Sequence, residues 1–375
     1  MNVQEVLNEM KTIYNQLLKY FDDDEDFLFL TKTFDELEIG KNIHKLKLLL
    51  HLLVKIGNNR HRESNFFDKI ERIINIFKAE IIEKFSNFEI FTIFQSNKRI
   101  LLFIIEEQII KIDEYIAKRM TDRKHVNANY PQYFAPEIKP FVTESFIRLF
   151  RKNKEKETKE DWIDSIFNEL PDNFYQKRKI AENDTYICSL IREDNVEEFI
   201  AHLNKTNISI KSVIMDSIFE TNHFLIKKKK PTLIEYAAFY GSIQIFNYLK
   251  FEGADLETDL WLYVIRGRNA ELIHILEENH VKTIDSLYYD PFFESIKCHH
   301  NEFANYIKDN LFTAENEYID DYMPTYSLKS YNFLFIENNF ETRLLFQYDY
   351  YMFVDLLIQE NKIDINKKLI LHIIF

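Results

Sequence analysis

The stretch PTLIEYAAFYGSIQIFNYLKFEGADL, residues 231–256, predicts two short helices and the turns that join them. Thr232 is a residue type that caps a helix, and Gly241 supplies the left-handed backbone conformation at which helices commonly end. An apolar stripe predicts a second helix, which Gly253 stops. The alanine pair at 237–238 is small where a neighbouring helix has to approach closely. The stretch therefore predicts a helical hairpin that packs against similar hairpins.

The same stretch resembles the ankyrin repeat, whose unit reads TPLHxAAxxG, then an apolar helix, then GAD. The matching residues are Thr232, Ala237, Ala238, Gly241, Leu249, Gly253, Ala254 and Asp255. The succession IEYAAFYGS, LWLYVIRGRN, SIKCHHNEFANYI and QENKIDIN also resembles the divergent ankyrin-repeat proteins of trichomonad parasites, well in the second half and weakly in the first. The resemblance implies an all-α solenoid of helix-turn-helix repeats, and it brings no established activity with it.

Repeat spacing in the second half is irregular. The apolar helix centres Ile200, Phe246, Ile273, Ala304 and Val354 are 46, 27, 31 and 50 residues apart, whereas a standard ankyrin unit has about 33 residues. The short spacings predict shortened loops between one repeat and the next. The long spacings predict insertions near residues 207–230 and 309–339.

The glycine at the turn between the two helices of a repeat is replaced in several units. Arg268, His299 and Asp349 stand at this position. His and Asp tolerate a positive φ better than most residues, whereas Arg tolerates it less well. The sequence therefore leaves open whether the turn at Arg268 has the backbone geometry of the glycine turns.

The first half contains one internal match to the second. NKRILLFIIEEQIIKID, residues 97–113, lines up with NAELIHILEENHVKTID, residues 269–285. We therefore expect a divergent α-helical region over residues 1–180, with degenerate repeats at 88–113, and an ankyrin-repeat region over 181–375 that is clearest at 231–309. Apolar periodicity in the first half predicts helices near 1–20, 42–56 and 64–85.

Composition and motifs argue against an enzyme. The chain has five glycines and no GxGxxG or GxxxxGK, so a dinucleotide or phosphate loop is excluded and no cofactor is expected. No GxSxG, HExxH or kinase-like set is present. The acidic run at residues 22–26 lacks the glycine and glutamate of a calcium loop. The run 298–300, Cys-His-His, has too few companion ligands for zinc, so a helix end explains it better.

Charge and cysteine content bear on the partner and the cellular location of the protein. The net charge is −13, and residues 181–375 hold 18 basic and 31 acidic side chains, whereas residues 1–180 hold 30 of each. The acidic half favours a basic protein partner and disfavours nucleic acid. Two cysteines give no disulfide framework and no apolar run spans a bilayer, so we expect an intracellular, cytoplasmic protein without a membrane span. The run Lys227–Lys230 keeps a nuclear location open.

The expected function is that of a scaffold or adaptor that binds another protein through the solenoid surface. The alternative is a structural or targeting element of a larger array, with a nuclear version. In the ankyrin family, residues at variable positions in the first helix of each repeat bind partner proteins. The resemblance places this role on Tyr236, Phe239, Tyr240, Tyr263, Arg266, Glu294 and Lys297, and on Cys298 beside them. The competing interpretation is that these side chains are simply buried between neighbouring repeats.

Overall fold

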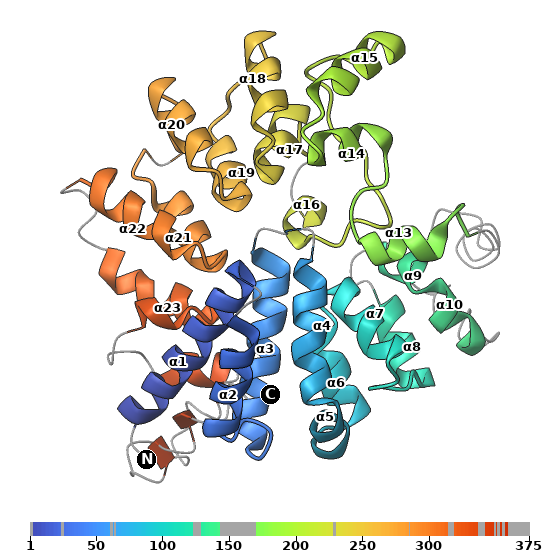
Figure 1. Ribbon diagram of the computed structural model, residues 1–375, viewed down its shortest axis with the longest axis vertical. Helices are drawn as coiled ribbons and strands as arrows, with labels where there is room; N and C mark the ends of the chain where they lie inside the picture. The colour runs from blue at the N-terminus through green and yellow to red at the C-terminus, as the bar shows by residue number, and fades with distance from the viewer. Residues whose placement is uncertain are drawn as a thin grey trace. The chain divides into compact units, whose positions relative to one another are not determined.

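The computed structural model describes residues 3–23, 26–60, 63, 65–122, 129–142, 170–227, 230–284, 286–313, 319–336, 342–348, 350, 353–354 and 357–358 (Figure 1). Besides turns and one isolated antiparallel bridge between Val213 and Thr232, the secondary structure of these residues is helical. The predicted all-α class is therefore confirmed for the described part of the chain. The chain forms two compact units, Met1–Lys69 with Leu256–Phe375, and Ile70–Asp255. The predicted division at residue 180 concerned where recognisable repeats begin, and it stays a prediction.

The first unit combines segments from both ends of the sequence. Its helices are α1 (Val3–Asp22), α2 (Phe27–Glu36), α3 (Ile43–Asn59), α19 (Leu260–Gly267), α20 (Ala270–Glu278), α21 (Tyr289–Lys297), α22 (Asn301–Asn310), α23 (Ile319–Ser330), η4 (Phe333–Phe335) and α24 (Thr342–Gln347). Helix α1 contacts both α2 and η4. Its apolar side is buried, including Leu7, Met10, Tyr14 and Leu17. The beginning of the chain and the region after residue 255 therefore share one core.

The second unit is built from the intervening segment. Its helices are α5 (Lys78–Lys84), α6 (Asn87–Phe94), α7 (Lys98–Glu106), α8 (Glu114–Thr121), α9 (Tyr130–Tyr133), α10 (Ala135–Ile138), η2 (Lys139–Phe141), α13 (Phe174–Ile180), α14 (Tyr186–Arg192), α15 (Val196–Thr206), α16 (His223–Lys227), α17 (Leu233–Tyr240) and α18 (Ile243–Phe251). Helix α4 (Phe66–Ile76) crosses the boundary between the units.

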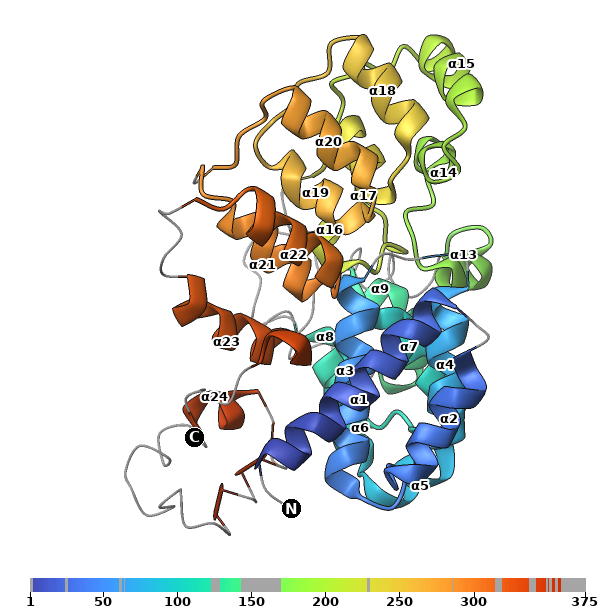
Figure 2. The same cartoon turned by 60° about the vertical axis from the view of Figure 1, so that its left-hand side comes forward.

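Antiparallel helix pairs recur in both units. In the second unit α6 packs with α7, α14 with α15, and α17 with α18; in the first unit α19 packs with α20 and α21 with α22 (Figures 1 and 2). Neighbouring pairs pack through equivalent helices, since α14 contacts α17, α15 contacts α18, and α19 contacts α21. Each unit therefore contains hairpins that lie against each other in the same orientation.

Residues 231–256 form the predicted hairpin. Thr232 and Glu235 make a reciprocal capping box at the start of α17: Thr232 Oγ1 accepts from the backbone N–H of Glu235 at 3.3 Å, and Glu235 accepts from that of Thr232 at 2.7 Å. Gly241 has φ 69° and Gly253 has φ 90°, so each hairpin helix ends in the left-handed conformation. The alanine pair 237–238 is fully buried, as close helix packing requires.

The matched stretches have the same local structure over residues 97–112 and 269–284. Their second helices, α7 and α20, are followed by Gln108 (φ 56°) and His280 (φ 50°) at equivalent positions. The backbone N–H of Ile109 donates to the carbonyl of Ile104 at 3.0 Å, and that of Val281 donates to the carbonyl of Leu276 at 2.9 Å, five residues back in each case. The internal match thus extends from the sequence to the turn geometry.

One predicted element of the first half is wrong in detail. The expected single helix near 64–85 is divided into α4 and α5 at Phe77, whose φ of −104° and ψ of 14° leave the helical range. The apolar pattern continues across the break because Ile74, Phe77 and Ile81 are all buried. Periodicity alone therefore cannot detect the interruption.

Candidate functional site

The turns inside the pairs α14–α15, α17–α18, α19–α20 and α21–α22, and the turn after α23, share one backbone conformation. Each has a left-handed residue shortly after its first helix, at Asp194 (φ 49°), Gly241 (φ 69°), Arg268 (φ 50°), His299 (φ 60°) and Tyr331 (φ 59°). The backbone therefore adopts the glycine-type turn at Arg268 as well as at His299. The turn between α6 and α7 differs, because Gln95 after α6 is right-handed, with φ −55°. Asp349, for which the same was expected, lies outside the described residues.

The residue after each left-handed position links neighbouring hairpins. Ser242 Oγ donates to the carbonyl of Ile191, His300 Nδ1 donates to that of Ile265 at 2.8 Å, and Asn332 Nδ2 donates to that of Ile296 at 2.9 Å. The accepting carbonyl each time lies three residues before the left-handed residue of the preceding turn. All three donors are almost fully buried. We call these three contacts the turn ladder; they give successive hairpins the same register.

In the second unit, a side chain at a left-handed position reinforces this register. The carboxylate of Asp194 accepts from the backbone N–H groups of Gln244 and Ile245 at 3.0 and 2.9 Å. These N–H groups belong to the first turn of α18, where helices lack internal acceptors and favour negative charge. One hairpin thus caps a helix of the next.

In the first unit, helix α1 contacts the turns. The Tyr14 hydroxyl lies 3.1 Å from Nδ1 of His299 and accepts from Asn301 Nδ2 at 3.1 Å. At the neighbouring turn, Arg268 pairs with Asp22 at 2.5 Å and with Glu302 at 3.0 Å. Polar groups of α1 therefore complete turns that belong to residues after 255.

The three partner-binding residues predicted on α17 lie together, yet largely inside the second unit. Tyr236 and Phe239 are 1% and 6% exposed. The ring of Tyr240 lies 4.8 Å from that of Tyr236 and 5.0 Å from that of Phe239. The Tyr236 hydroxyl accepts from Arg192 at 3.2 Å, and burial raises the pKa of this tyrosine well above its usual value. Such burial is what the competing interpretation expects of these aromatic residues.

The predicted residues of the first unit form a charged cluster between α19 and α21. Arg266, which is 2% exposed, pairs with Glu294, and Lys297 pairs with Glu294 at 3.1 Å. Burial opposes ionisation of Glu294, but the charges of Arg266 and Lys297 hold its pKa below the usual value. Tyr263 is buried as well. Of the four predicted positions, Lys297 presents the most side-chain surface, because its side chain is 42% exposed. That these seven residues bind a partner stays a prediction.

The Cys-His-His run at 298–300 does not converge on one point. His299 contacts Tyr14, whereas His300 belongs to the turn ladder. The Cys298 thiol lies 4.0 Å from Glu294, and burial raises its pKa to about 12. No group of three or more potential metal ligands occurs in the part of the chain that the structure describes. The three residues therefore serve helix packing and the turn.

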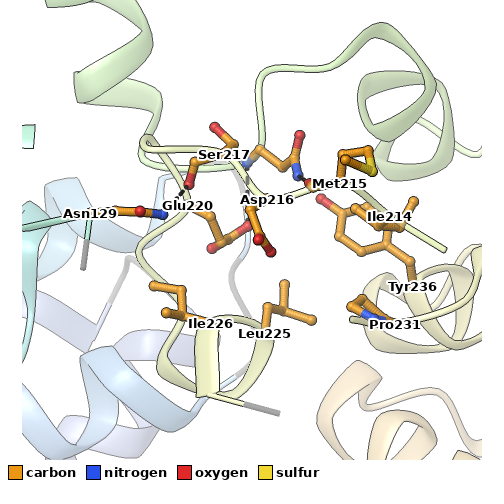
Figure 3. Close-up of a pocket in the computed structure, with 11 residues that line it drawn as sticks. Asn129, Ile214, Met215, Asp216, Ser217, Glu220, Leu225, Ile226, Pro231 and Tyr236 are labelled. Carbon is orange, nitrogen blue, oxygen red and sulfur yellow. Dashed lines mark hydrogen bonds between the residues drawn. The ribbon is translucent and has the colours of Figure 1, made fainter. Parts of the chain in front are cut away.

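A pocket of about 210 Å³ lies in the second unit beside the inserted segment between α15 and α17 (Figure 3). Apolar side chains and polar groups line it in comparable measure. The lining residues are Asn129, Asn183, Ile214, Met215, Asp216, Ser217, Glu220, Leu225, Ile226, Pro231 and Tyr236. Most of them come from the insertion that the long repeat spacing predicts, but no motif marks them as a site. Sequence reasoning therefore missed the pocket.

Hydrogen bonds hold the polar wall of this pocket. The Asn183 side chain donates to the carbonyl of Met215 at 2.7 Å, and its backbone N–H donates to Glu220 at 3.3 Å. Ser217 donates to Asp184 at 2.8 Å. The insertion is thereby fastened to the segment that precedes α14, so the wall has a defined conformation.

No protein-family model, curated protein or solved structure matches this chain. Among the described residues, no helix is long and apolar enough to cross a membrane. The basic run proposed as a nuclear signal includes Lys228 and Lys229, which lie outside the described residues. Function therefore has to be argued from the hairpins and from the pocket.

Proposed function

We propose that this chain is a scaffold or adaptor that binds a partner protein through a surface of stacked, ankyrin-like hairpins, and that it performs no catalysis. The turn ladder is the observation that carries the proposal. Ser242, His300 and Asn332 repeat one contact between successive hairpins, which is the nearest-neighbour construction of a repeat array. Arrays of this kind leave an extended side surface, and repeat proteins use that surface for binding.

The hairpins offer suitable contact residues. Phe251 at the end of α18 is 86% exposed and Tyr186 at the start of α14 is 54% exposed. Aromatic side chains are frequent among the residues that dominate binding energy at protein interfaces. The surplus of acidic residues after position 180 favours a partner with a basic surface and repels nucleic-acid phosphates.

Site-specific photo-crosslinking tests this proposal. Purified full-length chain carrying p-benzoylphenylalanine at position 186 or 251 is added to a lysate of the source cells, irradiated and analysed by mass spectrometry. Position 28 is the matched control, because Leu28 is 80% exposed but lies on α2, outside the hairpins. We expect the same protein to be captured from a hairpin position and not from position 28. Capture from position 28 alone, or no capture above background from any position, would contradict the proposal.

A further inference from the structure

The pocket beside the inserted segment has the chemistry of a receptor for one basic side chain. Asp216 and Glu220 contribute carboxylates to its lining, and the described lining residues include no lysine, arginine or histidine. Figure 3 shows these two carboxylates and the Tyr236 ring around one space, with Leu225, Ile226 and Pro231 opposite them. An ammonium or guanidinium group on an aliphatic stem matches both walls, because such side chains bury the stem and keep the charge near polar groups.

The size of the pocket agrees with a single side chain. Its volume of about 210 Å³ is below the range in which pockets for drug-sized ligands and cofactors begin, about 300 Å³. This size suits one long side chain.

Neighbouring basic groups are already paired with acidic side chains. Lys177 pairs with Asp184 at 2.9 Å, and Arg192 pairs with Glu182 at 2.8 Å. Lys230 pairs with Asp216 at 3.2 Å, in a contact where both side chains are substantially exposed. A lysine of the chain itself therefore already occupies part of the position at which an incoming cation would interact with Asp216.

We propose that this pocket binds a lysine or arginine side chain of the partner protein, which displaces Lys230 from Asp216. The inference rests on the proposed scaffold function and specifies the chemistry of the partner. Glu220 supplies a second negative charge from inside the pocket, where it accepts from the backbone N–H groups of Asn183 and Asn222. Tyr236 adds an aromatic side chain to the same lining.

Methyl NMR of the full-length chain tests the pocket without knowledge of the partner. Met215 lines the pocket and is one of six methionines, so ¹³C-methyl labelling gives few signals, and Met215→Leu assigns the relevant one. The probes are N-acetyl-arginine amide and N-acetyl-lysine amide. N-acetyl-citrulline amide and N-acetyl-norleucine amide have similar shapes without the side-chain charge. We expect saturable shifts of the Met215 signal with the two cations and at least fivefold weaker binding of the neutral probes.

Three variants determine whether Asp216 carries the interaction. Asp216→Asn should weaken cation binding about fivefold, the effect of one solvent-exposed charge pair. Asp255→Asn is the matched control, since Asp255 is a similarly exposed partner of a lysine, Lys211, and should leave binding unchanged. Lys230→Met should strengthen cation binding, because the internal competitor is removed; a purely structural Asp216–Lys230 pair predicts no gain.

The outcomes separate this inference from the proposed function. Equal Met215 shifts with charged and neutral probes, or no saturable shift up to tens of millimolar probe, would overturn the pocket assignment even if crosslinking identifies a partner. Selective cation binding that depends on Asp216, together with failed crosslinking, would retain the pocket and refute the hairpin surface. Equal effects of Asp216→Asn and Asp255→Asn would show a general charge effect and overturn the assignment.

Discussion

Left-handed turn residues combine backbone strain with side-chain contacts. Gly241 adopts a positive φ easily, whereas Asp194, Arg268 and His299 do so at a cost of order 1–3 kcal/mol each. Each of these three side chains makes a contact that glycine cannot make: Asp194 caps α18, Arg268 pairs with Asp22, and His299 contacts Tyr14. A residue other than glycine at these positions therefore gives up an easily formed turn and gains a tertiary contact.

His299 makes stability depend on pH. Burial, together with the positive charges of Arg60 and Lys55, lowers the pKa of His299 to about 3. The unfolded chain, with a histidine pKa of about 6.5, binds a proton as pH falls below that value, whereas the folded chain does not until about pH 3. Acid therefore favours unfolding, and we expect the free energy of unfolding to fall by about 2 kcal/mol between pH 7 and pH 5 because of this residue.

Urea unfolding at pH 7 and pH 5 measures this loss. His299→Asn is the informative variant, since asparagine also tolerates a positive φ but does not titrate in this range. The variant should be less stable at pH 7 because the Tyr14 contact changes, yet lose about 2 kcal/mol less than the parent on acidification. The same loss in both proteins would refute the role of His299.

Residue-level prediction succeeded where local chemistry decides the conformation. Thr232, Gly241 and Gly253 cap or end helices because of their own backbone and side-chain properties, and the sequence indicates them directly. The burial of Tyr236 and Arg266, in contrast, could not be predicted from the sequence. A tyrosine or an arginine suits either an interface or a core, and only the packing of other segments buries these two.

At the scale of the element, the turn ladder explains how hairpins of different sequence pack alike. Serine, histidine and asparagine occupy the donor position, so the position tolerates several side chains provided that each donates to a carbonyl. No residue type marks it in the sequence. The broken helix at Phe77 likewise escapes periodicity analysis, because the apolar stripe continues through it. The hairpins were thus predictable, and their connections were not.

Ser242→Ala tests the ladder. The Ser242 side chain is buried, so its removal leaves the Ile191 carbonyl without this donor and should destabilise the protein by about 1–2 kcal/mol. Ser189→Ala is the matched control, because Ser189 Oγ donates to the Tyr186 carbonyl within its own helix at an exposed position, where water replaces the bond. Chemical denaturation of both variants measures the difference, and equal stability changes would show that the ladder adds nothing.

At the scale of the whole molecule, the first unit joins residues 1–69 with residues after 255. No periodicity or motif in the sequence indicates which distant segments share a core, because the apolar side of α1 would suit any helical partner. For this reason the sequence left open whether residues 1–180 are a separate domain. The pairing instead depends on contacts such as Tyr14 with His299 and Asn301, and Asp22 with Arg268.

Tyr14→Phe tests this long-range pairing, since it removes one hydroxyl from α1 and leaves the ring in place. A buried group on His299 and a half-buried group on Asn301 lose their partner, so we expect a cost of about 2 kcal/mol and roughly thirtyfold faster amide exchange in α22 and η4. Hydrogen exchange with mass spectrometry locates the change, and α14 and α15 of the other unit serve as the internal reference. Thr12→Val is the control, because Thr12 donates only to the Asn8 carbonyl of its own helix at an exposed position. Faster exchange confined to α1, or an equal response to Thr12→Val, would mean that α1 does not stabilise the turns of the hairpins after residue 255.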